Sequence, residues 1–156
     1  MYGKPSRFTV KTGKAKSSVS ILNAVDKAMI DASIGDFNII EVSSVLPEDI
    51  ERVDHIESNK GEFKPAVMSK VTGSGKEMIA GLGWGIASTG GGYIIEHYKS
   101  GDNLKTEQFN KEIKEKLQEM ADCRDIKFKK SNFVYEDIEV NEDDYGCVMA
   151  VLVFQS

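Results

Sequence analysis

The hydrophobic residues of this chain follow two spacings, one typical of helices and one typical of strands. In residues 20–32 apolar side chains recur at three- and four-residue steps. This spacing predicts an amphipathic helix with Ser20 as its N-cap and Gly35 just beyond its end. Residues 106–120 show the same spacing, with an apolar stripe among Lys and Glu residues, and predict a second helix.

Strict alternation marks residues 78–86 as a strand. Its large side chains fall on one face, while Gly81, Gly83 and Gly85 fall on the other, so we expect the bare face to meet another layer closely. Further strands are predicted at 7–11, 37–42, 65–71, 93–98, 128–140 and 148–154, with loops at 13–18 and 56–64. Grouped strands with few helices favour a layered α+β sandwich over a doubly wound sheet. We expect one domain over residues 1–156.

Composition narrows the possible functions. The net charge of −5 and the pI near 5.1 argue against a nucleic-acid-binding protein, which needs a concentrated basic face. No apolar run approaches the roughly 20 residues of a membrane span, and the first residues lack the core of a signal peptide. We therefore expect a cytoplasmic protein that binds neither nucleic acid nor membrane. The two histidines, His55 and His97, lie too far apart to predict a metal site.

Candidate chemistry appears in "VSSVLP", where the predicted strand 37–42 runs into Ser43 and Ser44. The Ser44 hydroxyl can attack the Ser43 carbonyl and convert the amide to an ester. Elimination then leaves a Ser43 carboxylate and a dehydroalanine, and hydrolysis releases ammonia and leaves a pyruvoyl group at position 44. This path needs local strain and an oxyanion donor, for which Asn38 is a candidate. The dipeptide alone equally fits an ordinary loop.

The residues around the serine pair resemble those of a known family. The segment "LNAVDKAMIDASIGDFNIIEVSSVLPE" is similar to the cleavage-site region of the pyruvoyl-dependent arginine decarboxylases. The segments "GGYIIEHYKSGD" and "GCVMAVLVF" resemble two later strands of the same family. The resemblance covers most of residues 20–154. It implies an αββα sandwich of largely antiparallel sheets.

The resemblance also implies roles for individual residues. Cleavage would leave a β chain of residues 1–43 and an α chain of residues 44–156. Ser43, Ser44 and Asn38 would take part in processing, and Ser44 and Glu96 in catalysis. The substrate-binding residues implied by the resemblance are Asp26, Leu22, Gly35 and Val45. From the residues alone, Asp26 also fits an exposed helix carboxylate, Glu96 the polar side of an edge strand, and Asn38 a turn at a strand start.

The implied activity is decarboxylation of L-arginine to agmatine and carbon dioxide. The cofactor would be the covalently bound pyruvoyl group derived from Ser44, with no PLP and no metal. The resemblance further implies a homotrimer of cleaved protomers, or a higher multiple of trimers, with active sites between subunits. Two alternatives stay open: a decarboxylase of another amino acid, and an unprocessed, non-catalytic homologue with an assembly or regulatory role.

Overall fold

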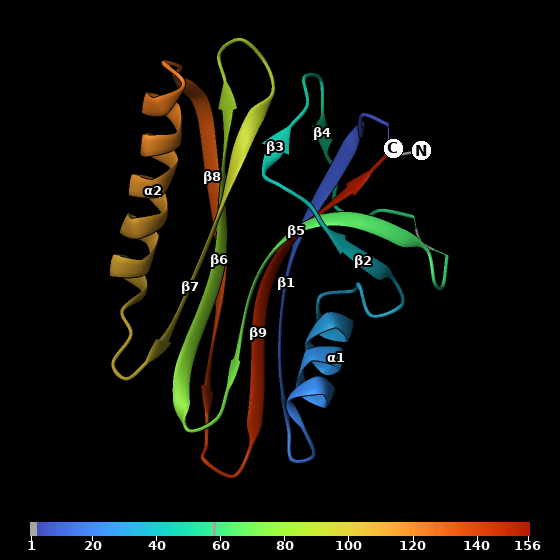
Figure 1. Cartoon of the computed structure of the whole chain (residues 1–156), viewed down its shortest axis with the longest axis vertical. Coiled ribbons are helices and arrows are strands. Elements are labelled where there is room, and N and C mark those ends of the chain that lie inside the picture. Colours follow the sequence, from blue (N-terminus) through green and yellow to red (C-terminus); the bar gives the residue numbers. More distant parts are fainter. Residues whose placement is uncertain (1–2, 58) are drawn as a thin grey trace.

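Two β-sheets pack face to face, and one helix covers the outer face of each (Figure 1). The computed structural model describes residues 3–57 and 59–156. The predicted αββα sandwich is confirmed: all strand pairs are antiparallel except β1 with β4 and β2 with β5. Within the described residues, neither helix is long and apolar enough to cross a membrane.

The two sheets differ in size. The five-stranded sheet has the order β2-β5-β9-β1-β4 and the four-stranded sheet the order β3-β7-β6-β8. The elements of the first sheet and its helix are β1 (Arg7–Ser17), α1 (Ile21–Asp31), β2 (Asn38–Glu41), β4 (Glu51–Arg52), β5 (Phe63–Gly73) and β9 (Tyr145–Gln155). Those of the second are β3 (Val45–Leu46), β6 (Lys76–Ala87), β7 (Gly92–Gly101), α2 (Thr106–Cys123) and β8 (Phe128–Val140).

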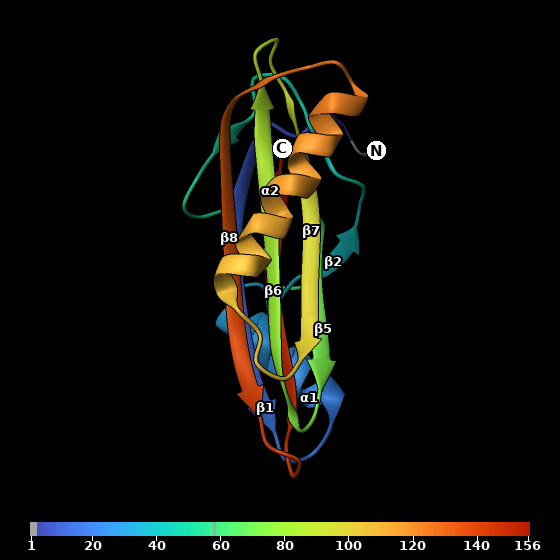
Figure 2. The ribbon, with the colours of Figure 1, turned by 90° about the vertical axis from the view of Figure 1, so that its left-hand side faces the viewer.

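The glycine face of β6 lies beneath α2, as its alternation predicts (Figure 2). A Cβ atom at Gly83 would lie 2.9 Å from Leu117 Cδ1, and one at Gly81 would lie 2.8 Å from Phe109 Cε1. The opposite face of β6 presents Leu82 to the core between the sheets. The bare glycines therefore let α2 pack directly on the strand backbone.

The predicted loop at 13–18 is wrong, because β1 continues as a strand to Ser17. Its whole length pairs with β9, from Arg7 opposite Gln155 to Ser17 opposite Tyr145. The polar composition of this segment suggested a loop, but the main-chain pairing with the buried strand β9 overrides that local preference. Gly13 is needed there because a Cβ atom would collide with α1.

The N-terminal end of α1 is confirmed, whereas its C-terminal end differs from the prediction. The Ser20 hydroxyl accepts a hydrogen bond from the Asn23 amide over 3.1 Å, as an N-cap should. The chain leaves the helix at Ser33, whose φ of 62° is in the left-handed region. Gly35 therefore does not supply the helix-terminating turn; it lies against the Ile30 side chain instead.

Candidate active site

The serine pair lies where the chain crosses from one sheet to the other. Strand β2 is an edge of the five-stranded sheet and β3 an edge of the four-stranded sheet, and residues 42–44 connect them. Before the crossing, the Val42 amide donates to the Ala66 carbonyl oxygen of β5 over 3.0 Å. After it, the Ser44 carbonyl oxygen accepts from the Ile94 amide of β7 over 3.0 Å. The Ser43–Ser44 peptide bond is thus held on its two sides by different sheets.

Two atoms of the serine pair would take part in the cleavage that the sequence predicts. Within residues 3–57 and 59–156, the Ser43 carbonyl oxygen and the Ser44 hydroxyl have no hydrogen-bond partner. Ser43 is exposed and Ser44 half-buried. An unengaged hydroxyl next to an unengaged carbonyl fits the formation of a pyruvoyl group at position 44.

A glycine turn holds β3 against β7. Gly90 and Gly91, between β6 and β7, have φ values of 94° and 68°, which favour glycine. A Cβ atom at Gly91 would come within 2.9 Å of the Leu46 carbonyl oxygen. Only a bare residue allows β3 to approach this closely, and β3 begins directly after Ser44.

Glu96 lies on the same strand that anchors Ser44. Because alternate residues of a strand share a face, Glu96 points the same way as Ile94, toward the five-stranded sheet. Its side chain is exposed, yet partial burial raises the pKa of its carboxyl group above the ordinary value, and the Glu41 carboxylate raises it further. The structure therefore brings Ser44 and Glu96 to one edge of β7, with a carboxyl group biased toward its protonated form.

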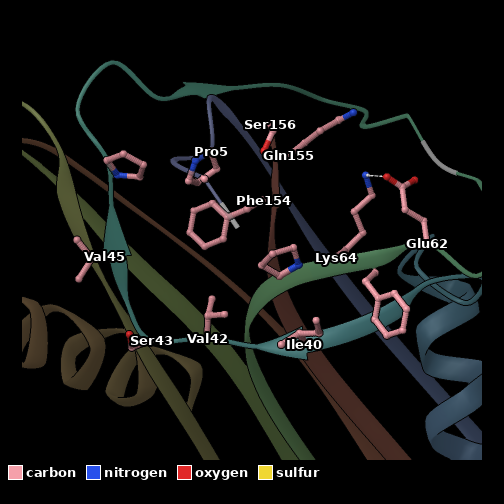
Figure 3. Close-up of a pocket in the computed structure, with 14 residues that line it drawn as sticks. Pro5, Ile40, Val42, Ser43, Val45, Glu62, Lys64, Phe154, Gln155 and Ser156 are labelled. Atoms are coloured by element: carbon pink, nitrogen blue, oxygen red, sulfur yellow. Dashed lines mark hydrogen bonds and ion pairs between the residues drawn. The ribbon is translucent and has the colours of Figure 1, made fainter. Parts of the chain in front are cut away.

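A cavity of about 630 Å³ opens beside the crossing segment (Figure 3). Ser43 and Val45 line one side, and Phe154 and the C-terminal Ser156 another. Its remaining walls include Pro5, Ile40, Val42, Pro47, Phe63 and Pro65. The cavity therefore combines a mostly apolar lining with direct access to Ser43, while Ser44 is not among its lining residues.

Three polar groups near this region were not found from the sequence. Lys64 is buried, and its Nζ lies 3.0 Å from Glu62 Oε1 at the cavity wall, which lowers the pKa of Glu62. Glu41, the third group, ends β2 and acts on Glu96 from the other sheet. Lys64 ends the predicted loop 56–64, and it is buried because β5 begins earlier than predicted, at Phe63. Nothing in the sequence placed Glu41 beside Glu96, because their proximity depends on how the sheets pack.

The other predicted site residues lie elsewhere in the protomer. Asp26 and Leu22 are exposed on α1, which covers the outer face of the five-stranded sheet, away from β7 (Figure 1). Gly35 lies in the turn after that helix. Asn38 begins β2, and its side-chain amide donates to the Gly61 carbonyl oxygen over 2.8 Å, several residues from the serine pair. One protomer therefore does not unite these residues with Ser44 and Glu96.

Clusters of metal-ligating side chains are missing from the described part of the chain. No group of three or more His, Cys, Asp or Glu side chains is arranged there to hold a metal ion. The serine pair and Glu96 are related through β7, which binds the Ser44 carbonyl oxygen at Ile94 and carries Glu96 two positions later.

The chain is similar over most of its length to known proteins. The family described as pyruvoyl-dependent arginine decarboxylase (PvlArgDC) matches residues 7–156. A protein of Methanopyrus kandleri named pyruvoyl-dependent arginine decarboxylase is 31% identical over 152 residues, which is 97% of this chain and 98% of the relative. Proteins of the same name from Pyrococcus horikoshii and Thermococcus sibiricus are 31% and 29% identical over 85% and 96% of this chain, and over 85% and 95% of their own lengths. The chain belongs to the pyruvoyl-dependent arginine decarboxylase family.

Proposed function

We propose that this protein decarboxylates L-arginine to agmatine and carbon dioxide in the cytoplasm, using a pyruvoyl group formed from its own Ser44. Family membership supports the reaction class, and the names of the relatives support arginine as the substrate. The observation that carries the proposal is the position of the serine pair. Its bond lies in the crossing segment, held from both sides, and Glu96 is on the strand that anchors Ser44.

Processing divides the chain between Ser43 and Ser44. The Ser44 hydroxyl attacks the neighbouring carbonyl, and the products are a β chain of residues 1–43 and an α chain of residues 44–156. The Ala66 and Ile94 hydrogen bonds keep the two ends in register while the bond between them changes. Asn38 assists this step. Its side-chain amide is bound to the Gly61 carbonyl oxygen within the protomer. Its contribution therefore requires that this hydrogen bond opens, or that the assisting Asn38 comes from a neighbouring copy.

Glu96 supplies a proton during turnover. A pyruvoyl group at position 44, once joined to the substrate amine, would supply the electron sink that decarboxylation requires. The α-carbon that has lost its carboxyl group then needs a proton, and a carboxyl group can donate one only while protonated. Partial burial and the Glu41 carboxylate both favour the protonated form of Glu96, so this residue is suited to the role.

Recognition of arginine requires a carboxylate for its guanidinium group, and Asp26 supplies it in the proposal. Because α1 and β7 lie on different sides of one protomer, the complete site combines α1 of one copy with Ser44, Val45 and Glu96 of another. The exposed apolar surface of α1 supports this arrangement: Leu22 is 80% exposed and Ile30 61% exposed. Leu22, Gly35 and Val45 then line the pocket of a homotrimer, or of a higher multiple of trimers.

Two measurements test the proposal. Denaturing electrophoresis with intact-mass analysis of the purified protein should show fragments 1–43 and 44–156 in place of the 17.2 kDa chain, with the second blocked at its N-terminus. Release of carbon dioxide should then be measured with arginine, lysine, ornithine and histidine as substrates. A single uncleaved chain without activity would refute the proposal and leave a non-catalytic homologue. Cleavage with higher activity on another amino acid would refute arginine as the substrate while retaining the pyruvoyl chemistry.

A further inference from the structure

Strand β8 forms a long free edge of the four-stranded sheet. It has thirteen residues and pairs along its length with β6 on one side (Figure 2). The other edge strands, β2, β3 and β4, have four, two and two residues. An edge strand of this length presents a row of main-chain N–H and C=O groups to another chain.

The charges along β8 are divided by sign. Its first part contains Lys129 and Lys130, and its last part contains Glu136, Asp137 and Glu139. A strand with this pattern is complementary to an antiparallel copy of itself, because the basic part of each copy then faces the acidic part of the other. We propose that β8 is a docking edge for β8 of a second copy of this chain, with the two strands related by a two-fold axis.

One register satisfies the charges and the apolar side chains together. With the axis at Phe133, Lys129 lies opposite Asp137 and Lys130 opposite Glu136, and the symmetry repeats both pairs. The Phe133 rings, 36% exposed in the protomer, then face each other at the centre. Opposite charges directly across antiparallel strands stabilise the pairing, in addition to the main-chain hydrogen bonds that give such contacts most of their affinity.

Strand β1 of the other sheet, whose side away from β9 pairs with β4 only at Arg7 and Phe8, shows the opposite arrangement. It contains Lys11, Lys14 and Lys16 and no acidic residue, so an antiparallel copy would bring lysines near lysines. Such repulsion is a common protection of an open edge against association. Strand β8 carries charges of both signs, and among the described residues a lysine covers its edge only at Asp137, so the contrast between the two strands favours β8 as the interacting edge.

Lys14 and the Glu136 side chain are the intramolecular groups that the association must displace at Asp137, because Glu136 Oε1 also accepts from the Asp137 amide over 3.1 Å. Lys14 Nζ lies 3.1 Å from Glu136 Oε1 and donates to the Asp137 carbonyl oxygen over 3.2 Å. Lys14 and Glu136 are partly exposed, so their pair is screened by solvent and Glu136 can interact with Lys130 of the second copy as well. Lys129 and the Asp137 carboxylate form no ion pair within the described residues. Reversing the charge of either side chain therefore tests the association without breaking an ion pair among the described residues.

The test uses charge reversal at these two positions in the full-length protein. K129E and D137K each place like charges across the axis, whereas the double variant K129E/D137K exchanges the signs and restores complementarity. K111E/D143K, which reverses two exposed charges on α2 and in the turn after β8, is the matched control. Sedimentation velocity and native mass spectrometry over a range of protein concentrations report the assembly mass.

We expect each single variant to have half the assembly mass of the wild type, or a dissociation constant roughly tenfold or more higher. The double variant and the control should have the assembly mass of the wild type. An equimolar mixture of the two single variants should also recover this mass, because a K129E strand and a D137K strand bring opposite charges together at both ends. Equal assembly masses for the wild type and both single variants would overturn the proposal. So would a control variant with half the wild-type assembly mass, or a mixture of the single variants that does not recover the wild-type assembly mass. These readouts do not depend on cleavage or decarboxylation.

Discussion

The Ile94 amide donates a hydrogen bond to the Ser44 carbonyl oxygen over 3.0 Å, on the strand that carries Glu96 two positions later. Ser43, by contrast, follows Val42, which is bound to Ala66 of the other sheet. Cleavage between the serines would therefore leave residue 44 attached to the strand of the proposed proton donor. The new carboxyl end at Ser43 would stay with the opposite sheet.

Replacing the proposed nucleophile should stop processing. We expect Ser44→Ala to remain a single 17.2 kDa chain, because alanine has no hydroxyl to attack the Ser43 carbonyl. Intact-mass measurement after prolonged incubation checks this. The control Ser88→Ala changes an exposed serine in the turn after β6 and should be cleaved like the wild type. Cleavage of Ser44→Ala at the same bond would refute the assigned nucleophile.

Replacing Glu96 should separate processing from turnover. Glu96→Gln keeps the side-chain size but cannot donate an acidic proton, so we expect normal cleavage and a kcat lower by roughly 10²–10⁴-fold. Single-turnover and steady-state carbon dioxide release measure the loss. If cleavage and turnover fall by the same factor, Glu96 supports the structure of the crossing segment instead of donating a proton.

The charge on Glu41 should shift the pH dependence of kcat. Burial raises the pKa of Glu96, and the Glu41 carboxylate adds to this because two nearby negative charges repel. Activity of a general acid falls as the pH rises through its pKa. Glu41→Gln removes one negative charge, lowers the pKa of Glu96, and should move the falling limb of the pH profile to lower pH.

The control for this prediction is Glu57→Gln, which removes an exposed charge from the loop after β4. Its pH profile should coincide with that of the wild type. A profile for Glu41→Gln that is unchanged, or that moves to higher pH, would contradict the proposed influence of Glu41 on Glu96.

The sequence predicted features that depend on local spacing better than those that depend on packing. The alternation of Gly81, Gly83 and Gly85 correctly predicted a face that meets another layer, because this pattern is visible within one strand. The extension of β1 to Ser17 was missed because its partner, β9, lies more than a hundred residues later. For the site, residue types identified the serine pair, but only the packed sheets place Glu41 near Glu96.

Substitution of Asp26 tests whether α1 recognises the substrate. Loss of a charged hydrogen-bond partner costs about 1.5–3 kcal/mol, so Asp26→Asn should raise the KM for arginine roughly 10- to 100-fold with normal cleavage. Asp36→Asn, an exposed carboxylate outside the helix, is the matched control. Steady-state assays of both variants with arginine and lysine give the comparison. An unchanged KM in Asp26→Asn would assign guanidinium binding to another residue.

The environment of His97 should make folding stability depend on pH. Its Nδ1 accepts a hydrogen bond from Lys116 Nζ over 2.8 Å, and the centroid of its ring lies 4.6 Å from the centroid of the Phe109 ring. Its Nε2 lies 3.3 Å from Glu112 Oε2, without hydrogen-bond alignment. Burial, followed by the Lys116 charge, lowers the pKa of His97, while Glu112 opposes this and Lys99 adds to it.

Below the unfolded pKa of about 6.5, the unfolded chain therefore binds more protons than the folded chain, and stability should fall as the pH decreases. His97→Gln should reduce this dependence between about pH 6.5 and 5, whereas His55→Gln, at an exposed position, should retain it. Urea unfolding midpoints at fixed protein concentration, measured in the uncleaved Ser44→Ala background, provide the test. If the stability of His97→Gln falls with decreasing pH as much as that of its parent, other groups cause the pH dependence, because glutamine at position 97 does not titrate.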